Sequence, residues 1–172
     1  LIAVNKGNII MLQVLVDWAV ATPLNGWVLS WNWTWVILEI LHFTGLTLLL
    51  GGLLVIDLRY MGFLTRVPAR ATHKLLIIVF IGFGINLTSG ILFFFGDPGR
   101  YAINIGFQIK FALIILAGLN VLWFYFKVDR KMHTWLDPNT PPALAKFIAS
   151  TSLVLWFGVL ICGRMIPYVG TG

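Results

Sequence analysis

Between Trp33 and Leu58 the chain reads WTWVILEILHFTGLTLLLGGLLVIDL, an apolar run in which Glu39 and His42 lie three positions apart. A helix of roughly 20 residues crosses the hydrocarbon core of a bilayer, about 30 Å, so this run is long enough to span a membrane. Residues three apart share one face of a helix, which places a carboxyl group beside an imidazole within the bilayer. Such groups are costly there and usually functional, so this run predicts both the class of fold and the place to search for a site.

Three further runs have the same length and apolar character, and the composition of the whole chain agrees with them. Hydrophobic residues make up 59% and charged residues 10% of the 172 residues, and the mean hydropathy is +0.93. A soluble globule of this size would need more polar surface. None of the runs alternates with the period of two that outer-membrane barrels require. The sequence therefore predicts an all-α integral membrane four-helix bundle over residues 33–172, with its other spans at Lys74–Phe95, Gly106–Phe126 and Ala143–Ile166.

Residues 1–32 form a separate tryptophan-rich segment. Its apolar stretch, Ile9–Val20, is too short to cross a bilayer, contains Gln13 and Asp17, and is followed by Pro23. Indole rings settle at headgroup depth, so we expect an interfacial amphipathic helix on the outer side of the membrane. The alternative is an uncleaved signal-like segment, but no cluster of positive charges precedes the apolar core. The tryptophans near this interface are Trp18, Trp27, Trp31, Trp33 and Trp35.

The basic residues indicate how the chain crosses the membrane. They gather in the loops after the first and third spans, whereas the loop between the second and third spans holds only Arg100. Basic loops are cytoplasmic by the positive-inside rule, so we expect both termini on the outer side of a bacterial inner membrane. The net charge of +6 then follows from topology, and no nucleic acid partner is needed to explain it. The two basic loops contain Arg59, Arg66, Arg70 and Lys74, and Lys127, Arg130, Lys131 and Lys146, respectively.

Polar residues of all four spans converge on the outer half of the predicted bundle. At a rise of about 1.5 Å per residue, Glu39 and His42 lie roughly 9 Å and 13 Å below the outer end of the first span. An unpaired charge at this depth is costly, so we expect Glu39 to face Lys110 or Arg164. The surplus positive charge would attract a haem propionate, a lipid phosphate or the polar head of a quinone. The predicted cofactor-binding residues are Glu39, His42, Gly45, Asn86, Lys110 and Arg164.

Gly45 extends the face of Glu39 and His42 along the first span. A small residue at this position lets another helix, or a flat cofactor, approach the backbone closely. The alternative interpretation of the same pattern is tight helix packing around one hydrogen-bonded histidine. The sequence leaves both interpretations open.

His42 is the predicted metal ligand. A low-spin haem b held in a bundle needs two axial ligands at one depth, and His73 and His133 lie toward the opposite, cytoplasmic side. The open alternatives are a haem with Met165 as a weaker second ligand, a five-coordinate haem, and a haem shared with a partner subunit or a second copy of the chain. Cys162 and Met165 with His42 would instead offer the soft ligands that Cu(I) prefers. Without a metal, a bound lipid or quinone is the expected occupant.

Four short motifs are distributed over the spans and their ends, namely Glu39-x-x-His42-x-x-Gly45, Asp57-Leu58-Arg59-x-x-Gly62, Phe107-x-x-Lys110 with Asn120, and Gly163-Arg164-x-Ile166-x-Tyr168. Together, over roughly residues 35–170, they resemble an uncharacterised family of small four-helix bacterial inner-membrane proteins. The resemblance implies the four-helix fold and no particular mechanism. At greater distance, the layout is similar to copper-resistance D-type and four-helix b-type cytochrome membrane proteins, although the paired histidines of the cytochromes are missing.

These observations lead to three functional hypotheses. The first is an integral membrane subunit of a redox or respiratory-type complex that holds haem b or quinone in the outer half of the bundle, where the cofactor performs the electron chemistry. The second is a cofactor-free accessory subunit that docks on a larger membrane complex. The third is a copper-handling or small transport protein, although no internal repeat or broken helix favours transport. We expect the lipid bilayer and other membrane subunits as partners, and the sequence offers no nucleophile and base pair for an enzyme acting alone.

Overall fold

The computed structural model describes residues 6–128 and 141–169, and these ranges contain helices and no strand. Four of the helices are long and apolar enough to cross a membrane, as the sequence predicts. Their bounds agree with the predicted spans to within a few residues, except that the second long helix begins earlier. The helices are α1 (Lys6–Val20), α2 (Pro23–Leu29), α3 (Thr34–Met61), α4 (Ala69–Gly96), α5 (Pro98–Ala102), α6 (Ile105–Lys127) and α7 (Ala143–Met165).

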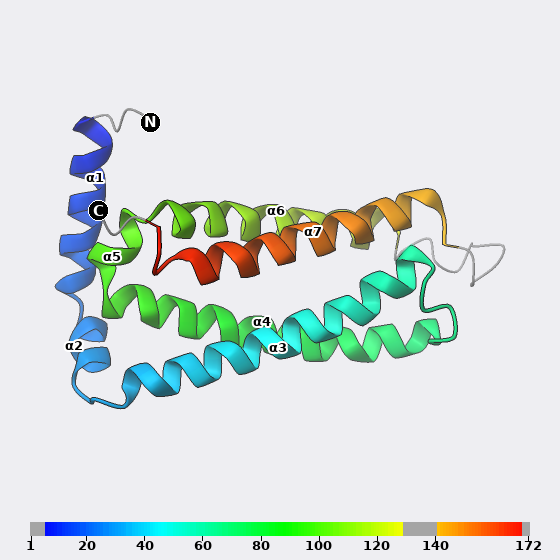
Figure 1. Ribbon diagram of the computed structural model, residues 1–172, viewed down its shortest axis with the longest axis horizontal. Coiled ribbons are helices and arrows are strands. Elements are labelled where there is room, and N and C mark those ends of the chain that lie inside the picture. Colours follow the sequence, from blue (N-terminus) through cyan, green and yellow to red (C-terminus); the bar gives the residue numbers. More distant parts are fainter. Residues whose placement is uncertain (1–5, 129–140, 170–172) are drawn as a thin grey trace.

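The four long helices form two antiparallel pairs, α3 with α4 and α6 with α7 (Figure 1). The turn that joins α3 to α4 begins at Gly62, whose φ of +94° lies in the left-handed region that glycine adopts without steric cost. The Gly62 amide donates back to carbonyls of the last turn of α3, which closes that helix. The α6–α7 connection lies in residues 129–140, which are outside the described ranges.

Glycines bring α3 and α4 into close contact. A Cβ atom at Gly45 would lie 2.8 Å from both Asn86 N and Gly82 O, and one at Gly82 would lie 2.6 Å from Leu49 N. These neighbours are backbone atoms, so a change of rotamer could not relieve the clash. Small residues commonly have this role between membrane helices, where lipid gives no hydrophobic driving force for association.

The tightest packing lies in the half of the bundle that holds the α3–α4 turn. Leu53, Ile56 and Tyr60 of α3 share one buried cluster there with Ala145 and Ile148 of α7. Toward the opposite end the α6–α7 pair diverges from the α3–α4 pair (Figure 1). The divergence leaves room for a cavity between the pairs at that end.

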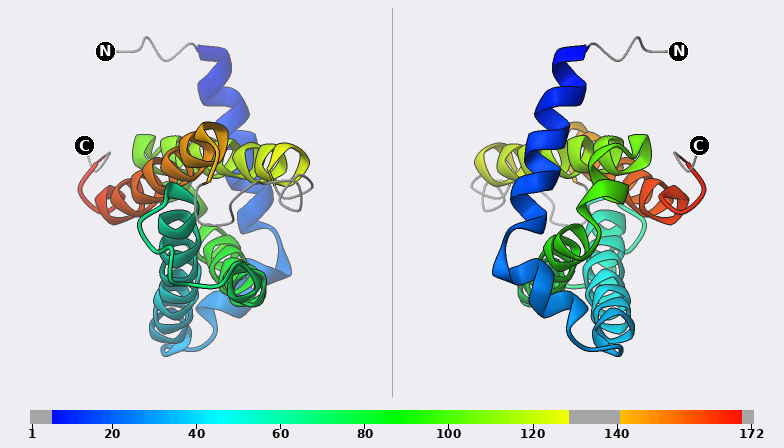
Figure 2. Two further views of the ribbon diagram at one scale, coloured as in Figure 1. Left: turned by 90° about the vertical axis from the view of Figure 1, so that its right-hand side faces the viewer. Right: turned by 90° about the vertical axis from the view of Figure 1, so that its left-hand side faces the viewer.

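The N-terminal helices α1 and α2 run across the diverging end of the bundle (Figures 1 and 2). The ring of Trp18 packs on that of Phe95 with centroids 5.7 Å apart, and Asn25 Nδ2 donates to Phe95 O at 2.7 Å. The structure therefore has a helix over the predicted stretch Ile9–Val20, while its place at the outer interface of a membrane stays a prediction. Pro23 also begins α2, because its fixed φ fits the first turn of a helix.

The basic residues near the α3–α4 turn differ in their surroundings. Arg59 is buried, and its Nε donates to Val67 O at 2.7 Å. This hydrogen bond connects the α3–α4 turn to the end of α3. Arg66, Lys74 and, at the start of α7, Lys146 are exposed. The orientation of the chain in the membrane stays a prediction. Outside the described residues lie Arg130, Lys131 and His133, together with the side chains of Arg70 and His73.

Candidate functional site

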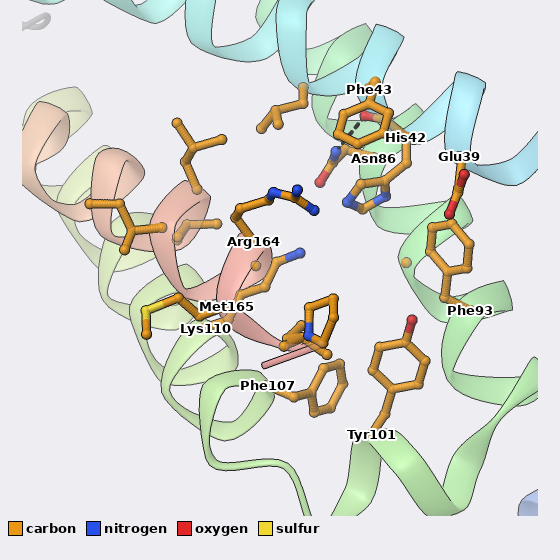
Figure 3. A pocket seen from close by; sticks show the side chains of 18 of the residues that line it. Glu39, His42, Phe43, Asn86, Phe93, Tyr101, Phe107, Lys110, Arg164 and Met165 are labelled. Atoms are coloured by element: carbon orange, nitrogen blue, oxygen red, sulfur yellow. Dashed lines mark hydrogen bonds between the residues drawn. The ribbon is translucent and has the colours of Figure 1, made fainter. Parts of the chain in front are cut away.

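A cavity of about 560 Å³ lies between the two helix pairs at their diverging end, beside α5. Figure 3 shows Glu39 and His42 of α3 on one side of it, and Lys110 of α6 and Arg164 of α7 on the other. Asn86 of α4 also lines the cavity, so five of the six predicted site residues surround one space. A cavity of this size falls within the range of roughly 300–1,000 Å³ that is usual for small-molecule sites.

His42 is oriented by a chain of hydrogen bonds on α4. Its Nδ1 lies 2.8 Å from Ser89 Oγ, and the Ser89 hydroxyl donates to Ile85 O at 2.7 Å. With the hydroxyl proton donated to this carbonyl, Ser89 accepts from His42, and Nδ1 carries the proton of the neutral imidazole. Nε2 then keeps a lone pair for a ligand. Gly90 leaves room for the ring, since a Cβ there would lie 3.6 Å from His42 Cε1.

Asn86 and Gly45 hold α3 and α4 together at the level of His42. Asn86 Nδ2 donates to the backbone oxygen of His42 at 2.9 Å, which ties α4 to α3 at the level of the imidazole. Gly45 does not line the cavity, and its close contacts are with the backbone of α4. Of the two interpretations of Gly45, the structure therefore shows helix packing.

Lys110 reaches the cavity by lying along a glycine of the neighbouring helix. A Cβ at Gly163 of α7 would be 3.3 Å from Lys110 Nζ and 3.6 Å from its Cδ and Cε. Gly163 thus leaves space for the lysine stem between α6 and α7, and Nζ points toward the cavity (Figure 3). The next residue, Arg164, is exposed, and its guanidinium carbon lies 5.7 Å from the centroid of the Tyr168 ring.

The expected ion pair of Glu39 with Lys110 or Arg164 is not formed among the residues that the structure describes. Glu39 is exposed, and the two cations lie across the cavity from it (Figure 3). The buried face of α3 runs through Leu38 and Gly45, and His42 beside it is half-buried. Successive residues of a helix differ by about 100° around the axis, so Glu39 lies at the edge of that face and not at its centre.

Aromatic rings complete the lining. Phe93 of α4 meets the His42 imidazole edge-on, with ring centroids 5.5 Å apart. The ring centroids of Phe107 of α6 and Tyr101 of α5 are 5.4 Å apart. The Tyr101 hydroxyl points into the cavity (Figure 3). Burial raises the pKa of Tyr101 above its ordinary 10.0, with the Glu39 carboxylate among the smaller causes, so Tyr101 is a neutral hydrogen-bond donor.

Sequence reasoning missed Phe93 and Tyr101 as parts of the site, and it placed Ser89 in the same half of the bundle without giving it a role. Asn86, Ser89 and Phe93 share one face of a helix by their spacing, and that pattern was an available signal. No comparable signal existed for Tyr101, because its position depends on the short helix α5, which follows α4 directly and turns the chain toward α6.

The expected metal ligands are not gathered at one point. The described residues contain no group of three or more His, Cys, Asp and Glu side chains that could hold a metal ion. Met165 lines the cavity but is 46% exposed, and its sulfur is turned away from His42 (Figure 3). Cys162 is a free, partly buried thiol. No observation on these residues favours the copper hypothesis over the others.

No protein-family model, curated protein or solved structure matches this chain. The chemistry of the cavity is therefore the basis for assigning a function. Its main features are a positioned imidazole, an ammonium group and a phenol around a space bounded by aromatic rings.

Proposed function

We propose that this protein is a membrane subunit of a redox-type complex in a bacterial inner membrane, and that its cavity binds the headgroup of a quinone. The observation that carries this proposal is the meeting of His42, Lys110 and Tyr101 around one cavity lined by aromatic rings. Lys110 and Tyr101 offer donors to the carbonyl oxygens of a quinone, and His42 Nε2 offers an acceptor to a hydroxyl of the reduced form. The ligand supplies the electron chemistry, while the protein supplies position and hydrogen bonds.

The cavity also has an apolar rim. Phe43 of α3 and Ile161 of α7 line it and are exposed at a surface that would face hydrocarbon. A ligand with a polar head and a long apolar tail could therefore enter from the bilayer and leave its tail in lipid. A phospholipid has such a tail, but its ionised phosphate only accepts hydrogen bonds, so a donor to His42 Nε2 would have to come from another group of its head. A quinone and its reduced form use both the donors and the acceptor.

Haem b is the second candidate, and the lone pair on His42 Nε2 favours it. The hydrogen bond from Nδ1 to Ser89 fixes the tautomer in the way that outer partners commonly do for metal-bound histidines. Since Met165 is turned away, this haem would be five-coordinate or would take its second ligand from a partner subunit. A Soret absorption band in the purified protein that is lost in His42→Ala would support haem. A colourless protein that binds quinone would exclude it as the resident cofactor.

The proposal is tested by equilibrium binding of a short-tailed ubiquinone analogue to the full chain in lipid nanodiscs. Lys110→Met removes the ammonium group but keeps an unbranched apolar stem. A hydrogen bond from a charged donor contributes about 1.5–3 kcal/mol, so we expect Kd to rise roughly 10–100-fold. Lys146→Met is the matched control, because Lys146 is exposed at the opposite end of the bundle, and its Kd should equal that of the wild type. Equal binding by all three proteins would contradict the proposal.

The alternative function is a cofactor-free accessory subunit that docks on a larger membrane complex. The exposed indoles of α1, α2 and the chain just after them, at Trp18, Trp27 and Trp31, favour it as a docking surface. A colourless, quinone-free protein that co-purifies with other membrane subunits, and loses them in Trp27→Ala with Trp31→Ala, would support this alternative. Retention of the subunits by that double variant would count against it.

A further inference from the structure

A second group of buried polar side chains lies in the opposite half of the bundle, away from the cavity. Asp57 of α3, Asn120 of α6 and Ser152 of α7 are only 6%, 6% and 5% exposed. Asp57 lies about one turn before the end of α3, and Asn120 about two turns before the end of α6. α7 starts at the end where α3 and α6 finish (Figure 1). Ser152 lies about two and a half turns into α7, so it comes to a similar depth.

Hydrogen bonds connect these side chains to one turn of α7. Asn120 Nδ2 donates to Ile148 O at 3.1 Å. The hydroxyl of Ser152 hydrogen-bonds the carboxyl group of Asp57. Ile148 and Ser152 are four residues apart, which is one helical turn, so Asp57 and Asn120 reach α7 at neighbouring points.

Two oxygen atoms of this cluster have no partner. Asp57 Oδ2 and Asn120 Oδ1 are buried, and neither has a hydrogen-bond partner among the described residues. An ionised carboxylate and an amide oxygen are both acceptors, so they cannot satisfy one another, and unpaired polar groups are costly in hydrocarbon. A proton on Asp57 Oδ2 removes the negative charge and converts that atom into a donor. A donor is what the unpaired amide oxygen of Asn120 lacks.

We propose that Asp57 is a proton-binding site, in which the carboxyl group is carried as the neutral acid and donates from Oδ2 to Asn120 Oδ1. The remaining carboxyl oxygen accepts from Ser152, so one bound proton pairs the polar atoms of the cluster. This site does not depend on the ligand of the outer cavity, because its residues and hydrogen bonds are all in the other half of the bundle.

The charged groups at this end belong to all four long helices. Lys74 of α4, Lys127 of α6 and Lys146 of α7 are exposed and keep their ammonium groups at the surface. Arg59 is two residues from Asp57, a spacing that places them on different sides of α3, and its Nε donates to Val67 O. Among the described residues, none of these cations neutralises the Asp57 carboxyl group, and in the proposed site a bound proton does so. Also at this end are Arg70 and His73, whose side chains lie outside the described residues.

This site is tested by infrared spectra of the full chain in lipid nanodiscs at neutral pH, compared between the wild type and single variants. We expect the carbonyl stretching band of a protonated carboxylic acid in the wild type and its loss in Asp57→Asn. Asp97→Asn is the matched control, since Asp97 caps α5 outside the spans through Arg100 N, and it should leave the band unchanged. Asn120→Leu should keep the band but move it to higher frequency, because the acid loses its acceptor.

A wild-type spectrum without the band, or a band that survives in Asp57→Asn, would overturn the proposal. An unshifted band in Asn120→Leu would overturn the assignment of Asn120 as the acceptor. A bound sodium ion is distinguished by the melting temperature in sodium chloride and in choline chloride. We expect equal values for the wild type, and a sodium-dependent increase that disappears in Asp57→Asn would replace the proton with a metal cation.

Discussion

At the scale of single residues, the imidazole of His42 is held by hydrogen bonds that end on the backbone. With the Ser89 hydroxyl proton donated to the carbonyl of Ile85, Nδ1 donates to Ser89. The rigid α4 helix therefore decides which ring nitrogen is protonated and leaves Nε2 available. The role of His42 could be anticipated from its depth in an apolar run, but the tautomer could not, because it depends on a hydroxyl 47 positions away.

Replacing Ser89 with alanine should weaken binding in the cavity without touching the ligand directly. The variant removes one hydrogen bond to His42, worth about 1 kcal/mol, so we expect the Kd of the quinone analogue to rise roughly fivefold. Thr88→Ala is the control, since Thr88 is the exposed neighbour on the same helix. An unchanged Kd in Ser89→Ala would show that the imidazole is oriented by other contacts.

Tyr101 should make the stability of the protein depend on alkaline pH. Burial raises its pKa above 10.0, so the neutral phenol is the form that the fold favours. The corresponding stability is fully present below the unfolded pKa of about 10 and is lost as pH rises through the higher folded value. As pH rises above about 10, the melting temperature of the wild type should fall more steeply than that of Tyr101→Phe. Parallel curves would show that Tyr101 ionises as freely in the fold as outside it.

At the scale of helices, the long apolar runs are predictable because length and hydropathy alone separate a membrane span from a soluble helix. The angle between the two helix pairs cannot be predicted in this way, because it depends on which small residues come into contact. Gly45, Gly82 and Gly52 lie in the α3–α4 contact, whereas Gly51 and Gly84 have open space where a Cβ would lie. The sequence does not distinguish these two groups of glycines.

The α3–α4 contact predicts a large difference between two glycine substitutions. Gly45→Val would place side-chain atoms against the backbone of α4, and overpacking of this kind costs about 1–3 kcal/mol. Gly51→Val introduces the same side chain where nothing lies within 4 Å. We expect the thermal unfolding midpoint in detergent to fall clearly for Gly45→Val and to stay near the wild-type value for Gly51→Val. Equal midpoints would show that the helices can separate at little cost.

At the scale of the whole molecule, the bundle has a tightly packed half and a half that holds a cavity. The sequence anticipates five residues of the cavity lining, because depth along each span follows from helical rise. It does not anticipate that Glu39 would sit at the rim, or that α5 would add Tyr101. Both outcomes depend on the rotation of each helix about its axis and on the geometry of the connections. Helices that are apolar on all sides specify these features weakly.

The proposed topology can be tested with single cysteines in a Cys162→Ser background. Arg66 and Arg100 are exposed near opposite ends of the bundle, on the α3–α4 turn and on α5. With both termini outside, a membrane-impermeant thiol reagent added to intact spheroplasts should label Arg100→Cys and spare Arg66→Cys. Labelling after lysis shows that both cysteines are accessible. The reverse pattern in intact spheroplasts would invert the topology and place the cavity in the cytoplasmic half.

The proposal that the cavity holds a quinone is tested most directly by the amount of quinone that accompanies the protein from its own membrane. The full chain is purified, extracted with organic solvent, and its quinone is quantified by chromatography per mole of protein. We expect close to one quinone per wild-type chain and a large loss in His42→Ala combined with Lys110→Met. The same trace amount in the wild type and in that double variant would contradict the proposal.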